Sequence, residues 1–202
     1  KGHFETLDLK HLGIKVPQFS YQRLKGSNPV AHMEMASTGE VACLGTDLYD
    51  TFYRAFRSTE SVISKKSIFI SIAQDKKVRL LDAIKALDDM GWDIYTTSGT
   101  HDFLAKHGVA SRCIHKASSN KSPNIKDMIL SQKIAMIINI PSGNASSKQI
   151  TDGFVIRRLA IDHHIPLVTN LQIAQLMMQC LAVREDFDQN VYSYQALMGA
   201  HN

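Results

Sequence analysis

From residue 66 onward, short apolar runs alternate with segments of helical periodicity, and this alternation limits the fold more than any other feature. The apolar runs are residues 67–72, 93–96, 112–114, 134–138 and 167–169. Strands that alternate with helices at this spacing form parallel βαβ units with right-handed crossovers. The pattern therefore predicts an α/β fold in which an open parallel sheet of five strands carries helices on both faces.

Glycine and proline residues mark the ends of the predicted elements. Leu80, Leu81, Ile84 and Leu87 recur at helical spacing after the first strand, and Gly91 stops that helix. Further helices are expected at residues 100–107, 124–132, 154–164 and 171–184. The second of these five helices ends before Gly108, and Pro166 opens the fifth strand. The last helix is expected to present one apolar face, made of Ile173, Leu176, Met177 and Leu181.

Several of the predicted strands run into residues that can hold an anion. The carboxyl ends of parallel strands meet at one edge of a sheet, so these residues are expected to converge. Two lysines, two threonines and an amide provide the chemistry of a phosphate or carboxylate site. Gly99 lets the backbone approach a ligand, and the helix that begins nearby offers unpaired N–H groups. The candidate residues are Lys77, Thr97, Thr100, Lys116 and Asn139.

The first 64 residues differ in kind from the rest. Residues 13–17 and Pro29 are interpreted as short irregular strands and turns. Residues 46–57 predict one capped helix, with Leu48, Phe52 and Phe56 on its inner side. This stretch is too short to bury a core of its own. The prediction is therefore a division into residues 1–64, the trailing edge of a preceding domain, and residues 65–202.

Composition excludes several classes of function. The chain has 202 residues and a net charge of +4, with no basic run dense enough for nucleic acid. No apolar stretch reaches the length that spans a membrane. Three widely spaced cysteines favour a reducing compartment over a disulfide framework or a zinc site. The chain begins at Lys1 without a methionine or a signal-peptide core, so it is interpreted as a fragment.

Residues 34–41, Glu-Met-Ala-Ser-Thr-Gly-Glu-Val, carry a resemblance to a known family. They resemble the signature that closes the second ATP-grasp unit of the large subunit of carbamoyl phosphate synthetase. The T-x-G-T motif at residues 97–100, Asn139 and the Val-Ile-Arg-Arg run at 155–158 follow in the order of that family. The octapeptide is specific, whereas T-x-G-T alone is weak. The resemblance covers nearly the whole chain and implies a methylglyoxal-synthase-like domain at residues 65–202, after an ATP-grasp remnant.

The resemblance implies a regulatory role. In this family the C-terminal domain binds an allosteric effector: a uridine nucleotide, inosinate or phosphoribosyl pyrophosphate, or N-acetylglutamate in the urea-cycle enzyme. Effector binding controls ATP-dependent synthesis of carbamoyl phosphate from bicarbonate and glutamine or ammonia, for pyrimidine and arginine biosynthesis. Carried over position by position, the effector pocket comprises Ser71, Lys77, Thr97, Thr100, Lys116 and Asn139.

The family also implies partners and a compartment. The parent enzyme would use ATP with Mg²⁺ or Mn²⁺ in upstream synthetase domains, together with a glutaminase part, while this fragment holds no cofactor. A cytoplasmic location is expected, or the mitochondrial matrix for a urea-cycle type, and oligomerisation is left open. Lys15 and Glu40 match an ion pair at the family's carbamate tunnel. The alternative for this pair is a partly exposed salt bridge of little energetic value.

Two departures from the family pattern bear on the effector. The sequence Asn139-Ile140-Pro141 resembles the urea-cycle form. However, that form has a tryptophan where this chain has Lys116 and an asparagine where it has Gly153. A cation suits phosphate better than an acetylated amino acid, so a phosphorylated effector is favoured.

Two other classes of function compete with regulation. A lyase of the methylglyoxal synthase type needs a carboxylate base in the loop before the third helix, and residues 116–123 contain none before Asp127. A pure interaction domain would leave the lysines and threonines with structural roles. In that interpretation the Thr97 hydroxyl caps a helix and Lys77 lies in a solvated first turn. At least one of Arg157 and Arg158 is expected to be a surface charge or an intramolecular pair.

Overall fold

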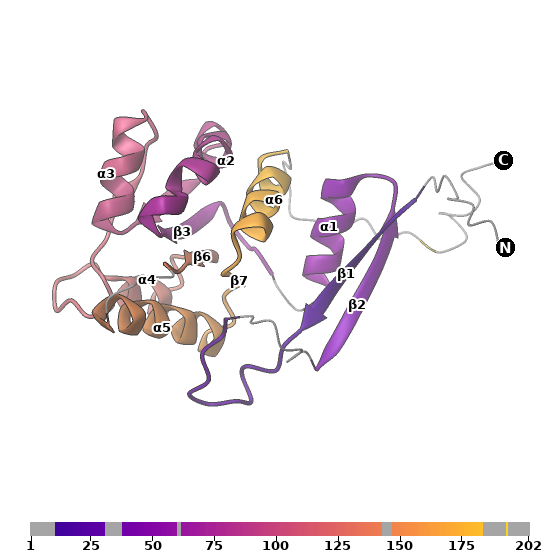
Figure 1. Ribbon diagram of the computed structural model, residues 1–202, viewed down its shortest axis with the longest axis horizontal. Helices are drawn as coiled ribbons and strands as arrows, with labels where there is room; N and C mark the ends of the chain where they lie inside the picture. Colours follow the sequence, from indigo (N-terminus) through magenta and orange to yellow (C-terminus); the bar gives the residue numbers. More distant parts are fainter. Residues whose placement is uncertain (1–10, 31–37, 60–61, 143–146, 184–192, 194–202) are drawn as a thin grey trace, which may run out of the picture.

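The structure is a computed structural model that describes residues 11–30, 38–59, 62–142, 147–183 and 193, with the backbone alone at 147–151. Its main body is a five-stranded sheet (Figure 1). The strands are β3 (Ser67–Ile72), β4 (Asp93–Thr96), β5 (Arg112–Cys113), β6 (Met136–Ile140) and β7 (Leu167–Val168). All pairings in this sheet are parallel, as the alternation of strands and helices predicts.

The strand order is β5-β4-β3-β6-β7. From β3 the chain adds β4 and β5 on one side, and then returns to the other side of β3 to add β6 and β7. The direction of winding thus reverses between β3 and β6. In open α/β sheets, the crevice for ligands lies at such a switch point, outside the carboxyl ends of the strands.

Helices cover both faces of the sheet (Figure 1). The helices α2 (Lys77–Asp89), α3 (Ser98–Lys106) and α6 (Leu171–Ala182) share one apolar core with Ile68, Ile70 and Ile138 of the sheet. The helices α4 (Ile125–Leu130) and α5 (Ser147–Asp162) enclose a second core with Phe69 and Ile137. Neighbouring strand residues point to opposite faces, so each central strand contributes to both cores. This arrangement confirms the predicted fold class.

Local signals end and begin the helices. Gly91 and Gly108 follow α2 and α3 with φ angles of 73° and 75°, which glycine adopts at little cost. Helix α4 begins with a capping box, in which the Asn124 side chain accepts from the Asp127 amide and Asp127 accepts from the Asn124 amide. A short 3-10 helix, Gln74–Lys76, leads into α2.

Two predicted helix boundaries are wrong. Helix α5 begins at Ser147 rather than residue 154, and α3 begins at Ser98, two residues before the predicted start near Thr100. In both cases the first turns contain serine, threonine or glycine. These residues have low helix propensity and add no apolar periodicity, so the pattern does not predict the start of the helix.

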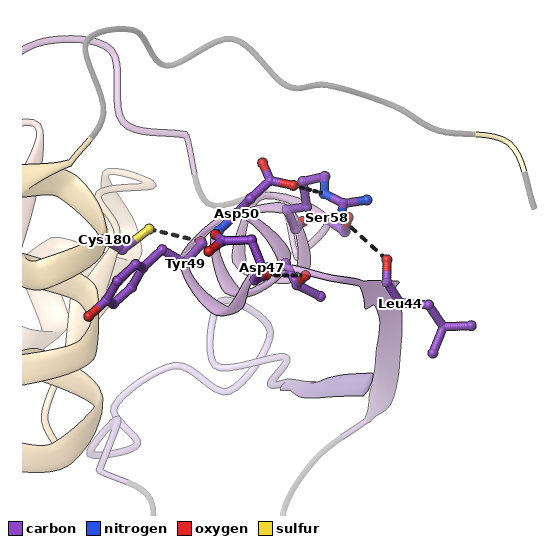
Figure 2. Close-up of polar contacts among 8 residues, drawn as sticks. Leu44, Asp47, Tyr49, Asp50, Ser58 and Cys180 are labelled. Carbon is purple, nitrogen blue, oxygen red and sulfur yellow. Dashed lines mark hydrogen bonds and ion pairs between the residues drawn. The ribbon is translucent and has the colours of Figure 1, made fainter. Parts of the chain in front are cut away.

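The N-terminal part forms a regular unit rather than irregular strands. Strands β1 (Leu12–Gln18) and β2 (Gly39–Gly45) pair antiparallel along seven residues each, followed by α1 (Leu48–Arg57). Figure 2 shows the start of α1, where the Asp47 side chain accepts a hydrogen bond from the Asp50 amide at 2.7 Å. Residues 34–37 of the octapeptide lie outside the described residues.

Helix α1 joins the core of the main sheet. Phe52, Tyr53 and Phe56 belong to the same apolar cluster as Met177 and Leu181 of α6. The Cys180 thiol of α6 also lies 3.1 Å from the Tyr49 carbonyl oxygen (Figure 2). The apolar core is therefore continuous across residue 64, while the division into two domains at that point stays a prediction.

Two predicted core residues are exposed. Leu48 is 45% exposed because it is the first residue of α1, beyond the edge of the shared core. Ile173 in the first turn of α6 is 42% exposed and lines a cavity instead of packing with Met177 and Leu181. Across the described residues, no helix is both long and apolar enough to cross a membrane.

Candidate functional site

The candidate site lies at the switch point between β3 and β6. Ser71 and Asn139 are direct partners in the parallel register of these strands. Asn139 was expected to follow β6, but the strand continues to Ile140, whose carbonyl accepts from the Ala73 amide at 3.0 Å. The Asn139 side chain is 4% exposed. The structure thus brings Ser71 and Asn139 together.

Lys77 is a buried cation at the start of α2. It is 4% exposed, and its Nζ donates to the Gly99 carbonyl oxygen and, at 2.7 Å, to Gln74 Oε1. Burial lowers the pKa of Lys77, and the charge of Asp102 acts in the opposite direction. The alternative of a solvated first turn is therefore wrong for Lys77. Its charge instead faces the first turn of α3.

Thr97 and Thr100 belong to the same first turn. Thr97 occupies the N-cap position of α3 with an extended backbone, but its hydroxyl makes no capping hydrogen bond. Thr100 is 2% exposed. A Cβ atom on Gly99 would lie 3.7 Å from Lys77 Nζ, so this glycine faces the lysine. Lys77, Thr97 and Thr100 consequently gather around the N-terminus of α3, which attracts anions.

Lys116 lies in the loop between β5 and α4 and is exposed. The loop is anchored to α5 because the Ser118 amide donates to Asp152 Oδ1 at 3.1 Å. Among the described residues, no hydrogen bond or ion pair joins the Lys116 side chain to the other five predicted residues. Its place in the site stays a prediction.

Arg157 contacts Asn139 in the candidate site, although it was not among the predicted site residues. It is 4% exposed on α5, and its Nη1 donates to Asn139 Oδ1 at 2.7 Å while its Nε donates to Asn28 Oδ1 at 2.9 Å. Burial lowers the pKa of this guanidinium. Arg158 instead pairs with Asp162 at 2.6 Å, which confirms that one of the two arginines forms an intramolecular pair.

Gly153 makes room for this arginine. A Cβ atom at Gly153 would lie 2.9 Å from Arg157 Nη1 and 3.7 Å from Asn139 Oδ1. Any larger residue here would push the guanidinium away from Asn139. The spacing of four residues between Gly153 and Arg157, one helical turn, is the sequence signal that could have revealed the pair.

Asp152 adds a buried carboxylate beside the site. It is 6% exposed, its Oδ1 accepts from Ser118, and its Oδ2 has no hydrogen-bond partner among the described residues. The Thr96 hydroxyl, at the end of β4, is likewise buried without a partner there. Buried polar atoms in native proteins are nearly always satisfied. The carboxylate oxygen can only accept, so it suits a partner with a hydrogen-bond donor, whereas the hydroxyl can donate or accept.

Lys15 and Glu40 form the predicted ion pair on the β1–β2 hairpin. Lys15 Nζ and Glu40 Oε2 lie 2.6 Å apart, with side chains 63% and 38% exposed. Such an exposed pair contributes about 0–1 kcal/mol. A role at a carbamate tunnel stays a prediction. In the described residues, no group of three histidines, cysteines or acids could hold a metal ion.

A cavity of about 850 Å³ lies away from the switch point. Its walls come from β1, the following residues 19–23, β7 and the first turn of α6. None of the six predicted effector residues lines it. The candidate site is therefore assigned from the convergence of buried polar groups rather than from the size of a cavity.

Comparison with known proteins shows the family of this chain. Residues 79–169 match the family described as MGS-like domain. The chain is 37% identical over 192 residues to the multifunctional protein pyr-3 of Neurospora crassa, covering 91% of the chain and 10% of that protein. It is 35% identical over 188 residues to human mitochondrial carbamoyl-phosphate synthase (ammonia), covering 89% and 12% respectively.

Among solved structures, methylglyoxal synthase from Elizabethkingia anophelis has a TM-score of 0.43 and 13% identity, covering 66% of this chain and 90% of that one. The chain spans about a tenth of the length of the curated relatives. The chain therefore carries an MGS-like domain, and over about 90% of its length it is homologous to the C-terminal region of the carbamoyl-phosphate synthase multifunctional proteins.

Proposed function

We propose that this chain is the regulatory region of a carbamoyl phosphate synthetase and that it binds an anionic effector at the β3–β6 switch point. The synthetase units would precede it and use ATP, with Mg²⁺ or Mn²⁺, to make carbamoyl phosphate from bicarbonate and glutamine or ammonia. A glutaminase part would be a partner, and the enzyme would be cytoplasmic, or mitochondrial if it is of the urea-cycle type.

The observation behind the proposal is a pair of buried cations that form no ion pair among the described residues, although the charge of Asp102 acts on Lys77. Lys77 and Arg157 are each 4% exposed, and the described residues place no carboxylate within ion-pair distance of either. Their hydrogen bonds go to neutral oxygens. Buried charges are costly unless they are paired, so a bound anion would offset that cost. The N-terminus of α3 would add to the same attraction.

Asp152 Oδ2, which has no hydrogen-bond partner among the described residues, favours ligands that carry a hydrogen-bond donor. Asp152 immediately precedes Gly153, which faces Asn139, and it holds the Lys116 loop through Ser118, so we place its free oxygen at the border of the candidate site. A ligand that satisfies it must carry a hydroxyl or an N–H group as well as an anion. Uridine nucleotides, inosinate and phosphoribosyl pyrophosphate combine phosphate with ribose hydroxyls. The proposed effector is a phosphorylated compound of this class.

N-acetylglutamate is the second candidate, because it also combines carboxylates with an N–H group. The sequence Asn139-Ile140-Pro141 and the similarity to a mitochondrial ammonia-type enzyme favour it. Against it, this chain has Lys116 where that form has a tryptophan and Gly153 where that form has an asparagine. The Lys116 cation suits a phosphate better than an acetylated amino acid.

Asp152 is the carboxylate to consider for the hypothesis that this chain is a lyase of the methylglyoxal synthase type. The loop before α4 contains no carboxylate base, but Asp152 contacts that loop through Ser118. We expect no catalysis by this chain, because general base chemistry needs a carboxylate in that loop, and Asp152 is instead buried on α5, where it accepts from the Ser118 amide. Methylglyoxal formation from dihydroxyacetone phosphate above the uncatalysed rate would overturn this expectation.

A thermal-shift series tests the proposed function. The 202-residue chain is heated with UMP, UTP, inosinate, phosphoribosyl pyrophosphate, N-acetylglutamate or inorganic phosphate. A ligand at 100 times its Kd adds about 2.7 kcal/mol to the native state, which raises the Tm of a domain of this size by roughly 5–11 °C. Failure of every compound to raise the Tm would reject the effector site.

A further inference from the structure

The loop between β1 and β2 is attached to the candidate site. We define the β1–β2 loop as residues 19–30. Arg158 Nη1 donates to the carbonyl oxygens of Tyr21 and Leu24, at 3.0 and 3.1 Å, and Arg157 Nε donates to Asn28 Oδ1 at 2.9 Å. Gln22 Nε2 lies 2.9 Å from His164 Nδ1. One face of α5 and the residues just after it therefore hold a loop that lies more than a hundred positions earlier in the chain.

Arg157 is shared between this loop and the pocket. The same guanidinium that donates to Asn28 donates to Asn139, which is buried at the switch point and pairs in register with Ser71. A guanidinium has only donors, so both amide groups must offer it their oxygen. Asn28, Arg157 and Asn139 thus form a continuous connection between the loop and the pocket.

We propose that Arg157 is a switch that exchanges its Asn28 contact for the bound effector. This inference rests on the proposed function. In the free chain both acceptors of Arg157 are neutral amides. The guanidinium gains a Coulomb attraction from a bound anion that a neutral amide cannot give, so an anion beside Asn139 draws the guanidinium away from Asn28. Effector binding then loosens the β1–β2 loop at residue 28.

The two positions of Arg157 provide the two states that allosteric coupling requires. The loop connects β1, which carries Lys15, to β2, which carries Glu40. A change at Asn28 therefore acts directly on the part of the chain that precedes the MGS-like domain. Coupling is reciprocal, so the Asn28 contact must weaken effector binding by the same factor by which the effector weakens the contact.

Hydrogen exchange and calorimetry on the 202-residue chain test this switch. For each compound that binds, we expect saturating ligand to raise amide exchange in the β1–β2 loop at least about threefold. Asn28→Ala removes the competing acceptor, so it is expected to bind the same compound about two- to tenfold more tightly. Its loop exchange should already be fast without ligand and should not respond further. Asn28 is exposed, so this variant is expected to fold normally.

Two further variants isolate the role of Arg157. Gln22→Ala breaks a contact of the same loop without touching Arg157, and it should bind ligand with the wild-type Kd and retain the exchange response. Arg157→Lys keeps the charge but cannot donate to Asn28 and Asn139 in the same planar geometry. It is expected to bind ligand measurably while the loop no longer responds.

The outcomes separate the switch from the proposed function. If ligand binds but the loop exchange of the wild type does not change, or if Asn28→Ala binds no more tightly than Gln22→Ala, the switch is wrong and the effector site stands. If no compound binds, the proposed function fails. The connection from Asn28 through Arg157 to Asn139 can then be tested without ligand. If it exists, Asn139→Ala should alter the amide hydrogen exchange of residue 28. Unchanged exchange in that variant would reject the connection.

Discussion

Gly153 and Arg157 lie one turn apart on α5, and a Cβ atom at Gly153 would come within 2.9 Å of Arg157 Nη1. The absence of a side chain at Gly153 allows the guanidinium to reach Asn139 Oδ1 at 2.7 Å. A glycine in the middle of a helix lowers stability by about 0.5–1 kcal/mol relative to alanine. The position thus gives up some helix stability and keeps a buried cation at the switch point.

Gly153→Asn tests this relationship. The new side chain would displace Arg157 from Asn139, so the affinity for a phosphorylated effector should fall by about 1.5–3 kcal/mol, the range for hydrogen bonds to charged groups. Helix propensity does not oppose the change, because asparagine is no worse than glycine inside a helix. Titration calorimetry measures the affinity and a melting curve checks the fold. Wild-type affinity in a folded variant would show that Arg157 does not contribute to the site.

Lys77→Met removes the buried ammonium while keeping a long side chain. We expect effector affinity to fall by about 1.5–3 kcal/mol, or roughly ten- to 150-fold. Stability should stay equal or rise, since replacing a buried charge with an apolar group is often favourable. Lys85→Met is the matched control, because Lys85 lies exposed on the same helix. Equal affinity in the two variants would contradict the assignment of Lys77.

The pH dependence of effector binding should report the lowered pKa of Lys77. Only the protonated amine attracts an anion, so affinity should decline as pH rises through that pKa. The decline should begin below the range in which an exposed lysine titrates, because burial favours the neutral amine. Above about pH 8 the phosphate itself is fully ionised and does not contribute to the change.

The effect of pH on the stability of the ligand-free chain has the opposite sign to its effect on effector affinity. Without ligand, burial penalises the protonated Lys77, so its cost is fully present below the folded-state pKa and is relieved as pH rises through that value. Lys77→Arg should bind effector with little dependence on pH over the same range, since arginine stays charged. A wild-type affinity that remains constant up to the pKa of exposed lysines would argue against Lys77 as an anion ligand.

The capping box of α4 predicts a defined loss of stability. Asn124→Ala should destabilise the chain by about 1 kcal/mol, because it removes the acceptor for the first-turn amides of Lys126 and Asp127. The exposed substitution Lys126→Ala is the control. Urea unfolding measures both variants. A loss no larger than that of the control would show that the cap does not stabilise the helix.

Acid should weaken the same cap. The Asn124 amide and the Ser122 hydroxyl donate to Asp127, and they lower the pKa of its carboxyl group. The stabilisation from this group is therefore present above its unfolded pKa and is lost as pH falls through its folded pKa. Asp127→Asn should flatten this part of the stability profile. An unchanged profile would assign the acid sensitivity to other groups.

The fold could be predicted because its main signals are local. Alternating strands and helices determine a parallel sheet, and the strand-end rule places Lys77, Thr97, Thr100 and Asn139 around one edge. Arg157 was missed because an arginine beside Arg158 on a helix normally faces solvent. Its partner Asn28 lies 129 positions away, so this contact depends on tertiary packing alone.

The burial of Asp152 and the exposure of two predicted core residues also could not be predicted from local sequence patterns. Asp152 is polar and lies among serine, threonine and glycine, so no periodicity marks it as buried. Leu48 and Ile173 follow the apolar pattern of their helices, but both are exposed. Leu48 is the first residue of α1, whereas Ile173 lies beside the buried face of α6, which already includes Leu171 and Ala174. Periodicity indicates the general face of a helix, and it does not determine the width or the end of the buried stripe.

The most direct test of regulation uses point variants of the proposed parent synthetase rather than a truncation. Deleting residues 65–202 would remove the effector site, but it would also uncover Phe52, Tyr53 and Phe56 of α1, which share a core with α6. Thr97→Ala and Lys77→Met avoid that damage. The measurement is ATP-dependent carbamoyl phosphate synthesis at increasing effector concentration. We expect both variants to make carbamoyl phosphate at a measurable rate that no longer responds to effector. A full effector response in both variants would contradict this and would place the regulatory site elsewhere in the enzyme.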